Sequence, residues 1–175
     1  MKKITDWKQL IRDHFQKLTF LIGMMILCVY FSAFAKNFAS LSNLVNIAQQ
    51  TAVIAIVAMG QTIAIAGGGI DLSVGSVVAL SSVTCASLLS AGISIPVAVA
   101  CALLSGIACG FVTGSLVYFG KIPPFIATMG MMSIIRGVVY VITDGVPISG
   151  LPPEFSVLGL GKLWGTVPFS VLIMV

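Results

Sequence analysis

One short stretch of the chain, AGGGIDLSVGS at residues 66–76, combines residue types that seldom occur together in an apolar sequence. It places the carboxylate of Asp71 just after three consecutive glycines at positions 67–69. Glycines can end a helix, because they adopt backbone angles closed to other residues. The side chain of Asp71 or Ser73 can then accept from free N–H groups at the start of the next helix, where the helix dipole favours negative charge.

Motifs for catalysis, nucleotide binding and metal binding are absent from the sequence. It contains no G-x-x-x-x-G-K-[ST], H-E-x-x-H or G-x-S-x-G pattern, and Leu72 occupies the position of the third glycine in a dinucleotide fingerprint. His14 has no partner at ligand spacing, and the four cysteines lie in apolar runs without a C-x-x-C pair. We therefore expect no catalytic residue, no metal and no cofactor bound by this chain.

The composition is that of a membrane protein. Hydrophobic residues make up 58% of the chain and charged residues 8%, with a mean hydropathy of +1.13, whereas soluble domains carry about 25% charged residues. The net charge of +4 mainly describes the first 17 residues. Because no basic stripe follows them, a nucleic-acid partner is not expected.

Five apolar runs, each close to or above the length needed to cross a hydrocarbon core of about 30 Å, predict membrane helices. The run at 18–34, with its basic flank and Ala33-Phe34-Ala35, is also typical of a secretory signal, but the spans that follow favour a retained helix. A sixth run opens at Pro168, and the chain ends within it. The five runs cover residues 18–34, 44–66, 74–91, 96–119 and 125–142.

The segments outside these runs predict the organisation and orientation of the chain. Residues 1–17 carry apolar side chains at helical spacing, which predicts an amphipathic interfacial helix on the cytoplasmic surface of the membrane. Five lysines and arginines precede the first span and place the N-terminus in the cytoplasm. Residues 18–175 then form the transmembrane domain, and its Gly- and Pro-rich segment 143–165 is an outer loop with one or two short interfacial helices.

Two sets of uncharged residues within the spans are candidates for a solute route or for helix packing. A polar set can line a water-filled route for a neutral, hydroxyl-rich solute, or can form hydrogen bonds between helices; it comprises Gln49, Gln50, Thr51, Gln61 and Thr62. A stripe of small residues at every fourth position fits close packing inside the bundle or a dimer contact; it comprises Ala98, Ala102, Gly106, Gly110 and Gly114.

Only Asp71 and Arg136 are ionisable within the predicted spans. Arg136 can extend to the outer interface or form a structural ion pair with Asp144, and contact with a solute is the alternative. A helix break such as the one before Asp71 is tolerated at membrane depth only where protein or water surrounds it. Broken helices of this kind are typical of transporters.

Three strings together resemble a known family. GGGIDLSVGSVVAL, then GKIPPFIATMGMMSIIRGVVYVITDGVPIS, then FSVLGLGKLWG occur in the order found in the membrane subunit of monosaccharide ABC importers, the ribose-permease family, and the resemblance covers the chain from about residue 41 onward. The helix-break motif comprises Gly67, Gly68, Gly69, Asp71, Leu72, Ser73 and Gly75. The family's motif positions further include Pro124, Thr128, Arg136, Gly137 and Gly145, and we count Thr128 among the candidate pathway-lining residues.

The resemblance implies an all-α integral membrane protein, a polytopic helix bundle of the ABC type II importer permease kind. Of roughly ten transmembrane helices in a complete subunit, five to six are present here. The implied partners are a second permease subunit in a homo- or heterodimer, a cytoplasmic ATP-binding subunit that uses ATP and Mg²⁺, a periplasmic sugar-binding protein facing residues 143–165, and membrane lipid. The implied location is the bacterial inner membrane.

The resemblance also implies the function: a permease subunit, without enzymatic activity, that forms the path for ribose or a similar monosaccharide. Two alternatives stay open. A complete subunit is nearly twice as long, and its second half carries the segment that grips the ATPase, so a truncated or split subunit without independent transport is one alternative. The other is a secondary carrier or channel whose broken helix binds solute directly.

Overall fold

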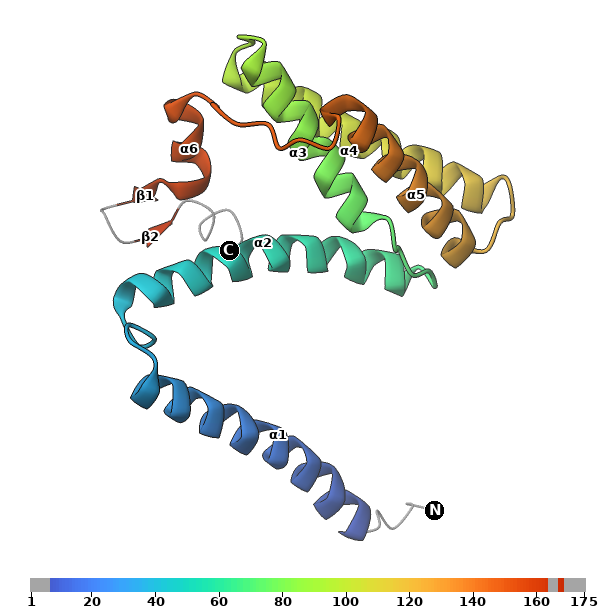
Figure 1. Cartoon of the computed structure of the whole chain (residues 1–175). Coiled ribbons are helices and arrows are strands. Elements are labelled where there is room, and N and C mark those ends of the chain that lie inside the picture. The colour runs from blue at the N-terminus through green and yellow to red at the C-terminus, as the bar shows by residue number, and fades with distance from the viewer. Residues whose placement is uncertain (1–6, 164–166, 169–175) are drawn as a thin grey trace. The chain divides into compact units, whose positions relative to one another are not determined.

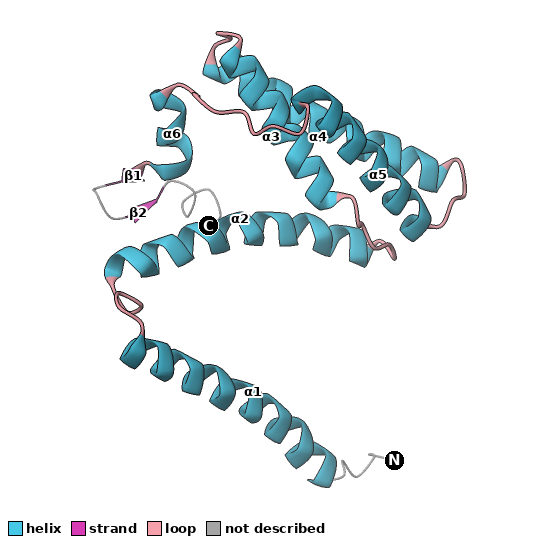
Figure 2. Cartoon of the chain, viewed as in Figure 1, coloured by secondary structure: helices cyan, strands magenta, loops and turns pink. Residues whose placement is uncertain are grey.

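The computed structural model describes residues 7–163 and 167–168, with side chains described for residues 18–157 and 161. The regular elements among these residues are helices, apart from one antiparallel pair of two-residue strands (Figures 1 and 2). Residues 1–47 and 48–175 form two compact units, which we describe separately. In chain order the elements are α1 (Trp7–Phe34), α2 (Leu41–Ala66), α3 (Val74–Ser90), α4 (Ile95–Tyr118), α5 (Pro124–Thr143), α6 (Pro153–Leu160), β1 (Lys162–Leu163) and β2 (Val167–Pro168).

The first unit contains α1 and the start of α2. Helix α1 runs without a break from Trp7 to Phe34, so the predicted interfacial helix and the first apolar run are one continuous helix. The following turn leads into α2 through Ser40, whose hydroxyl donates to the Asn37 carbonyl (2.7 Å) and accepts from the Asn43 N–H (3.2 Å). The interfacial position of residues 1–17 and their cytoplasmic side stay predictions.

The five predicted spans all fall on helices in the described part of the chain. Helices α2, α4 and α5 are long and apolar enough to cross a membrane, while Leu18–Phe34 of α1 and the 17-residue α3 are shorter apolar helices. The prediction of an all-helical membrane chain is thereby confirmed, with the small strand pair as its one exception among the described residues. Residues 169–175, where the sixth span was predicted to continue, lie outside the described residues.

Helices α3, α4 and α5 pack against one another in the second unit, and α4 runs antiparallel to its two neighbours (Figure 1). Their small core contains Cys85 and Leu89 of α3 and Ala98 of α4, all buried. Leu151 and Phe155, which follow α5, pack against this core. The predicted outer loop is therefore attached to the end of the bundle where α3 and α4 meet, and α6 lies within it.

Glycine ends both α2 and α3 in the same way. At the end of α2, the Gly68 N–H donates to the Ile65 carbonyl (2.9 Å) and the Gly69 N–H donates to the Ala64 carbonyl (3.0 Å). Gly68 has φ +82°, the left-handed region in which a side chain costs about 1–2 kcal/mol. This pattern is a Schellman motif, which satisfies the last carbonyls of a helix and reverses the chain. Gly92 ends α3 with the same bonds at φ +80°.

Candidate functional site

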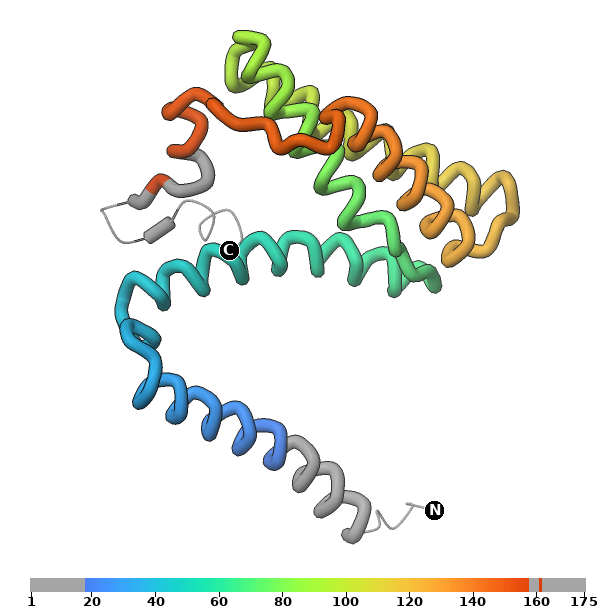
Figure 3. The backbone as a smooth tube through the Cα atoms, viewed as in Figure 1, coloured from blue at the N-terminus to red at the C-terminus, as the bar shows by residue number. Residues whose placement is uncertain are grey.

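The break between α2 and α3, residues 67–73, is fastened to the start of α5; we call these residues the junction (Figure 3). A Cβ atom added at Gly69 would lie 3.2 Å from the Cβ of Pro124. The backbone of the junction therefore packs closely on Pro124, and a side chain at position 69 would be crowded. The Thr128 hydroxyl donates to the carbonyl of Ile70 (3.2 Å), 58 residues earlier in the chain. These two contacts attach α5 to the irregular backbone, while Gly67, Gly68 and Ile70 stay exposed.

Asp71 organises the start of α3 by an indirect route. Its Oδ1 accepts from the Ser73 N–H (2.7 Å) and from the Ser73 hydroxyl (2.6 Å). The Ser73 carbonyl then accepts from the N–H groups of Ser76 and Val77, both at 2.9 Å, which begins the helix. Ser73 is only 2% exposed, and Asp71 is partly buried.

This arrangement corrects one detail of the predicted cap. The Ser73 side chain accepts no hydrogen bond from α3, although Ser73 is the residue that precedes the helix. Its backbone is already near helical angles (φ −81°, ψ −14°), and its hydroxyl turns back to the Asp71 carboxylate. A serine hydroxyl that donates to a carboxylate makes a charge-assisted bond, which is stronger than a bond between neutral groups.

A cavity of about 300 Å³ lies beside the junction. Asp71 lines one side, Gly110 and Gly114 of α4 line another, and Thr113 and Thr128 add polar edges. The hydroxyls of both threonines donate to backbone carbonyls, that of Thr113 to Cys109 at 2.8 Å. Among the described residues, hydrogen bonds reach only Oδ1 of Asp71, so its second oxygen is available at the edge of the cavity.

The stripe of small residues on α4 divides into two parts. Ala98 is fully buried, and a Cβ atom added at Gly106 would lie 3.3 Å from the Ser81 hydroxyl of α3, so this part is packed. A Cβ atom at Gly110 or Gly114 would meet no described atom within 4 Å. The expectation of one uniformly packed stripe needs this correction, because Gly110 and Gly114 line the cavity beside the junction instead of a packed contact.

The polar set on α2 does not gather into one site. Gln50 and Gln61 lie eleven residues apart, which is about three turns, on the same face of the helix. Gln61 Oε1 is buried without a hydrogen-bond partner among the described residues, whereas the Thr62 hydroxyl donates to the Ala58 carbonyl of its own helix (2.7 Å). Gln50 and Thr51 are exposed. Their role as a solute route stays a prediction.

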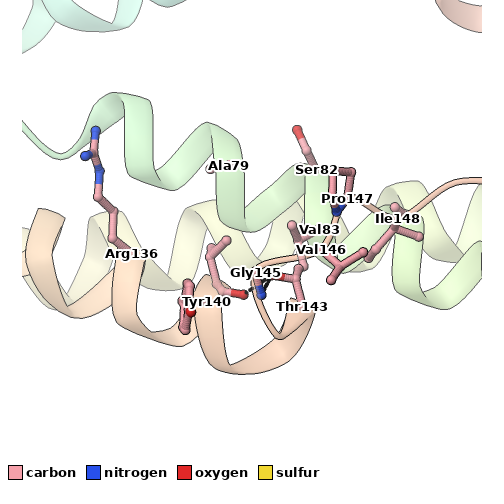
Figure 4. Close-up of a pocket in the computed structure, with 12 residues that line it drawn as sticks. Ala79, Ser82, Val83, Arg136, Tyr140, Thr143, Gly145, Val146, Pro147 and Ile148 are labelled. Atoms are coloured by element: carbon pink, nitrogen blue, oxygen red, sulfur yellow. Dashed lines mark hydrogen bonds between the residues drawn. The ribbon is translucent and has the colours of Figure 1, made fainter.

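Arg136 and Asp144 form no salt bridge within residues 18–157, whose side chains the structure describes. Asp144 follows the last residue of α5 in a left-handed conformation (φ 49°), about 12 Å along the helix axis from Arg136. That separation is too large for the ion pair that the sequence suggested. Arg136 instead extends from α5 alongside α3 (Figure 4).

Arg136 lines a second cavity, of about 560 Å³, which the sequence did not reveal. We call it the outer cavity; its walls include Ala79 and Val83 of α3, and Arg136, Tyr140 and Thr143 of α5 (Figure 4). These two groups are more than fifty residues apart in the chain, so only their packing shows that they face one space. No group of acidic, cysteine or histidine residues in the described part of the chain could hold a metal ion.

A polytopic helical chain with a glycine-made helix break that is attached to a neighbouring helix has the architecture of a membrane transport permease. The comparison with protein families makes this specific. The chain belongs to the family described as the permease component of the branched-chain amino acid transport system, which matches residues 43–173. No solved structure matches this chain.

Individual relatives narrow the comparison further. The ribose import permease protein RbsC of Escherichia coli K12 is 44% identical over 158 residues, which are 88% of this chain and 49% of that protein. RbsC of Bacillus subtilis 168 is 37% identical over 94% of this chain and 52% of its own length. The autoinducer 2 import system permease protein LsrC of E. coli SMS-3-5 is 34% identical over 86% of this chain and 44% of its own length.

These comparisons confirm the resemblance to ribose permeases. The chain spans about half the length of the curated relatives it matches. The family match and the apolar helices together make it a multi-pass membrane protein.

Proposed function

We propose that this chain forms part of the pathway by which a monosaccharide, ribose or a similar sugar, crosses the bacterial inner membrane. The observation that carries the proposal is the 44% identity to the ribose import permease of E. coli K12 over 88% of the chain. The match to the permease of another import system, for autoinducer 2, is lower at 34%. Ribose is therefore the first substrate to test.

The residues support a passive pathway that a partner opens and closes. The spans carry few ionisable side chains that could form a proton relay. The sequence also contains no nucleotide-binding motif. The energy would come from a cytoplasmic ATP-binding subunit. A second permease subunit would complete the pathway, and a periplasmic sugar-binding protein would deliver the sugar to the outer loop, residues 143–165.

The junction would give this pathway a rigid element. Its backbone is held by the close contact of Gly69 with Pro124 and by the Thr128 hydrogen bond to Ile70. Polar backbone groups and one oxygen of Asp71 face a cavity there. In this proposal Asp71 shapes the pathway and does not bind sugar.

The test is uptake of radiolabelled D-ribose by cells of the organism that encodes the chain, with and without its gene. We expect uptake to fall to background in the deletion strain and to return when the gene is supplied again. An excess of unlabelled ribose should compete, and labelled leucine should enter equally in both strains. Unchanged ribose uptake, or loss of leucine uptake alone, would contradict the proposal.

The proposed orientation has its own test. Ser149 and Lys121 are both exposed, and the proposal places them on opposite sides of the membrane. In a variant whose four native cysteines are alanine, Ser149→Cys should react with an impermeant maleimide added outside intact cells. Lys121→Cys should react only after the cells are permeabilised. The reverse pattern would overturn the orientation.

A further inference from the structure

We propose that the outer cavity is a binding site for a neutral polyol, and that Arg136 is its principal hydrogen-bond donor. This inference rests on the proposed function and goes beyond it, because it names the residues that contact the sugar. It also gives Arg136 a ligand in place of the ion pair with Asp144, which the structure lacks. Three observations carry the inference: the shape of the cavity, the unpaired charge of Arg136, and the fixed conformation of the cavity's rim.

The volume and lining of the outer cavity suit a monosaccharide. Ligand pockets typically measure about 300–1,000 Å³ and combine apolar walls with a few polar groups. This one measures about 560 Å³, and Val139 of α5 is among its apolar lining residues. Ala79 and Val83 of α3 add further apolar walls (Figure 4). A sugar ring has C–H faces and a hydroxyl-bearing edge. The apolar walls can contact the faces while the polar groups bind the edge.

The guanidinium of Arg136 is one of two polar groups at this cavity that have no hydrogen-bond partner among the described residues. It lies about two turns before the end of a 20-residue apolar helix, and no carboxylate pairs with it among the described residues. A charge at such a depth is costly unless hydrogen-bond acceptors surround it. A guanidinium carries five N–H donors, and a polyol supplies several hydroxyl oxygens that accept them without bringing a second charge into the membrane.

Tyr140 provides a second free polar group at the same cavity. No hydrogen bond engages its hydroxyl among the described residues, and the ring lines the cavity together with Arg136. The Thr143 hydroxyl, by contrast, is already used: it donates to the Val139 carbonyl (3.0 Å) and accepts from the Gly145 N–H (3.2 Å). The groups available to a ligand are therefore the guanidinium and the phenol, a donor set suited to neutral hydroxyls.

The rim of the cavity is held in one conformation. Gly145 has φ +71°, and a Cβ atom there would lie 2.9 Å from Tyr140 Cε2, so the turn packs directly on the aromatic ring. The Val146 N–H donates to the Thr143 carbonyl (2.9 Å), which closes the turn after α5. A pocket that is already formed loses less conformational entropy on binding.

Protection of a cysteine from alkylation tests the site directly. Ser82 is exposed and lines the cavity, so Ser82→Cys in the cysteine-free chain should react with a small methanethiosulfonate reagent in membranes that contain the whole transporter. D-ribose at several times its dissociation constant should slow this reaction about fivefold. Adding Arg136→Gln should abolish the protection, and Arg136→Lys should retain part of it.

The control is Ser133→Ala on the same helix, an exposed residue outside the cavity whose hydroxyl donates only to the Met129 carbonyl. It should leave the protection unchanged. If Arg136→Gln does not reach the membrane, Tyr140→Phe is tested in its place in the same alkylation experiment. It should weaken the protection by ribose measurably. Ribose that never slows the reaction, protection that survives in Arg136→Gln, or protection that is undiminished in Tyr140→Phe overturns the inference. Normal ribose uptake in the same cells would then show that the proposed function stands without this site.

Discussion

The two ends of α5 make similar contacts with different parts of the chain. At its start, Pro124 and Thr128 contact the junction, which precedes α3 in the chain. At its end, Thr143 and Tyr140 contact Gly145, only a few residues further on. Each end thus has a threonine hydroxyl in a hydrogen bond and a ring close to a glycine. One end is bound to a distant segment, and the other is bound to its own continuation.

This difference explains where the larger cavity lies. The start of α5 is attached by direct contacts to the junction, the segment that leads into α3. The end of α5 is stabilised locally and leaves a space of about 560 Å³ against α3, into which Arg136 faces. We infer that the start of α5 maintains the fold and that its end is available for a ligand. The following substitutions test this contrast, from the largest expected effect to the smallest.

Gly69→Leu should have the largest effect. A Cβ atom at this position lies 3.2 Å from Pro124, and leucine adds three further carbons to a contact that is already tight. Overpacking of this kind lowers the free energy of unfolding by about 3 kcal/mol. The measurement is denaturation of the purified chain in detergent. Gly60→Leu on α2, where no described atom lies within 4 Å, is the control and should be tolerated. Equal stability of the two variants would show that the junction is not packed on α5.

Gly145→Ala tests the outer end and should cost less, about 2 kcal/mol, because alanine is strained in the left-handed region and meets the Tyr140 ring. Gly150→Ala separates these two causes: its φ of +76° is similar, but no described atom lies within 4 Å. We expect Gly150→Ala to be the more stable variant when the two are compared in the same denaturation experiment. A Gly145→Ala variant as stable as wild type would remove the evidence for a fixed rim.

Asp71→Ala should lower the free energy of unfolding by about 1–2 kcal/mol, as loss of a capping side chain does. The substitution removes the acceptor of both the Ser73 N–H and the Ser73 hydroxyl. Asp71→Asn keeps a carbonyl oxygen and should lose less, while still lowering the yield of folded chain in membranes. If Asp71→Asn leaves the yield unchanged but alters which sugar is taken up, Asp71 contacts the sugar and its structural role is wrong.

Thr128→Val should have a smaller effect than the substitutions above, about 1 kcal/mol, the usual contribution of one hydrogen bond. The bond lost joins α5 to the junction at Ile70. Thr143→Val, at the other end of the helix, removes bonds that stay within the end of α5 and the turn that follows it, and it should change the global unfolding energy less. Thermal denaturation of both variants gives the comparison. A larger loss for Thr143→Val would reverse the contrast between the two ends.

Much of this chain could be predicted from local patterns. The apolar runs became helices close to the predicted boundaries, because run length and the positions of glycine and proline are properties of neighbouring residues. The break at Gly68 was predictable for the same reason, since its left-handed conformation depends on the backbone alone. Residues 7–17 of the predicted interfacial helix are helical, but α1 continues through residue 18 without interruption, and the interfacial position stays a prediction.

The sequence by itself therefore determined that this is a multi-pass helical membrane protein with a glycine break before Asp71, and its motifs identified the family. Only the tertiary structure decided which small residues of α4 are packed, that Thr128 holds the junction, and that Arg136 faces a cavity with no acidic partner among the described side chains. The physical reason is distance along the chain. Helix formation depends on residues within a few positions of each other, whereas contacts and cavities depend on how segments far apart in the sequence pack together.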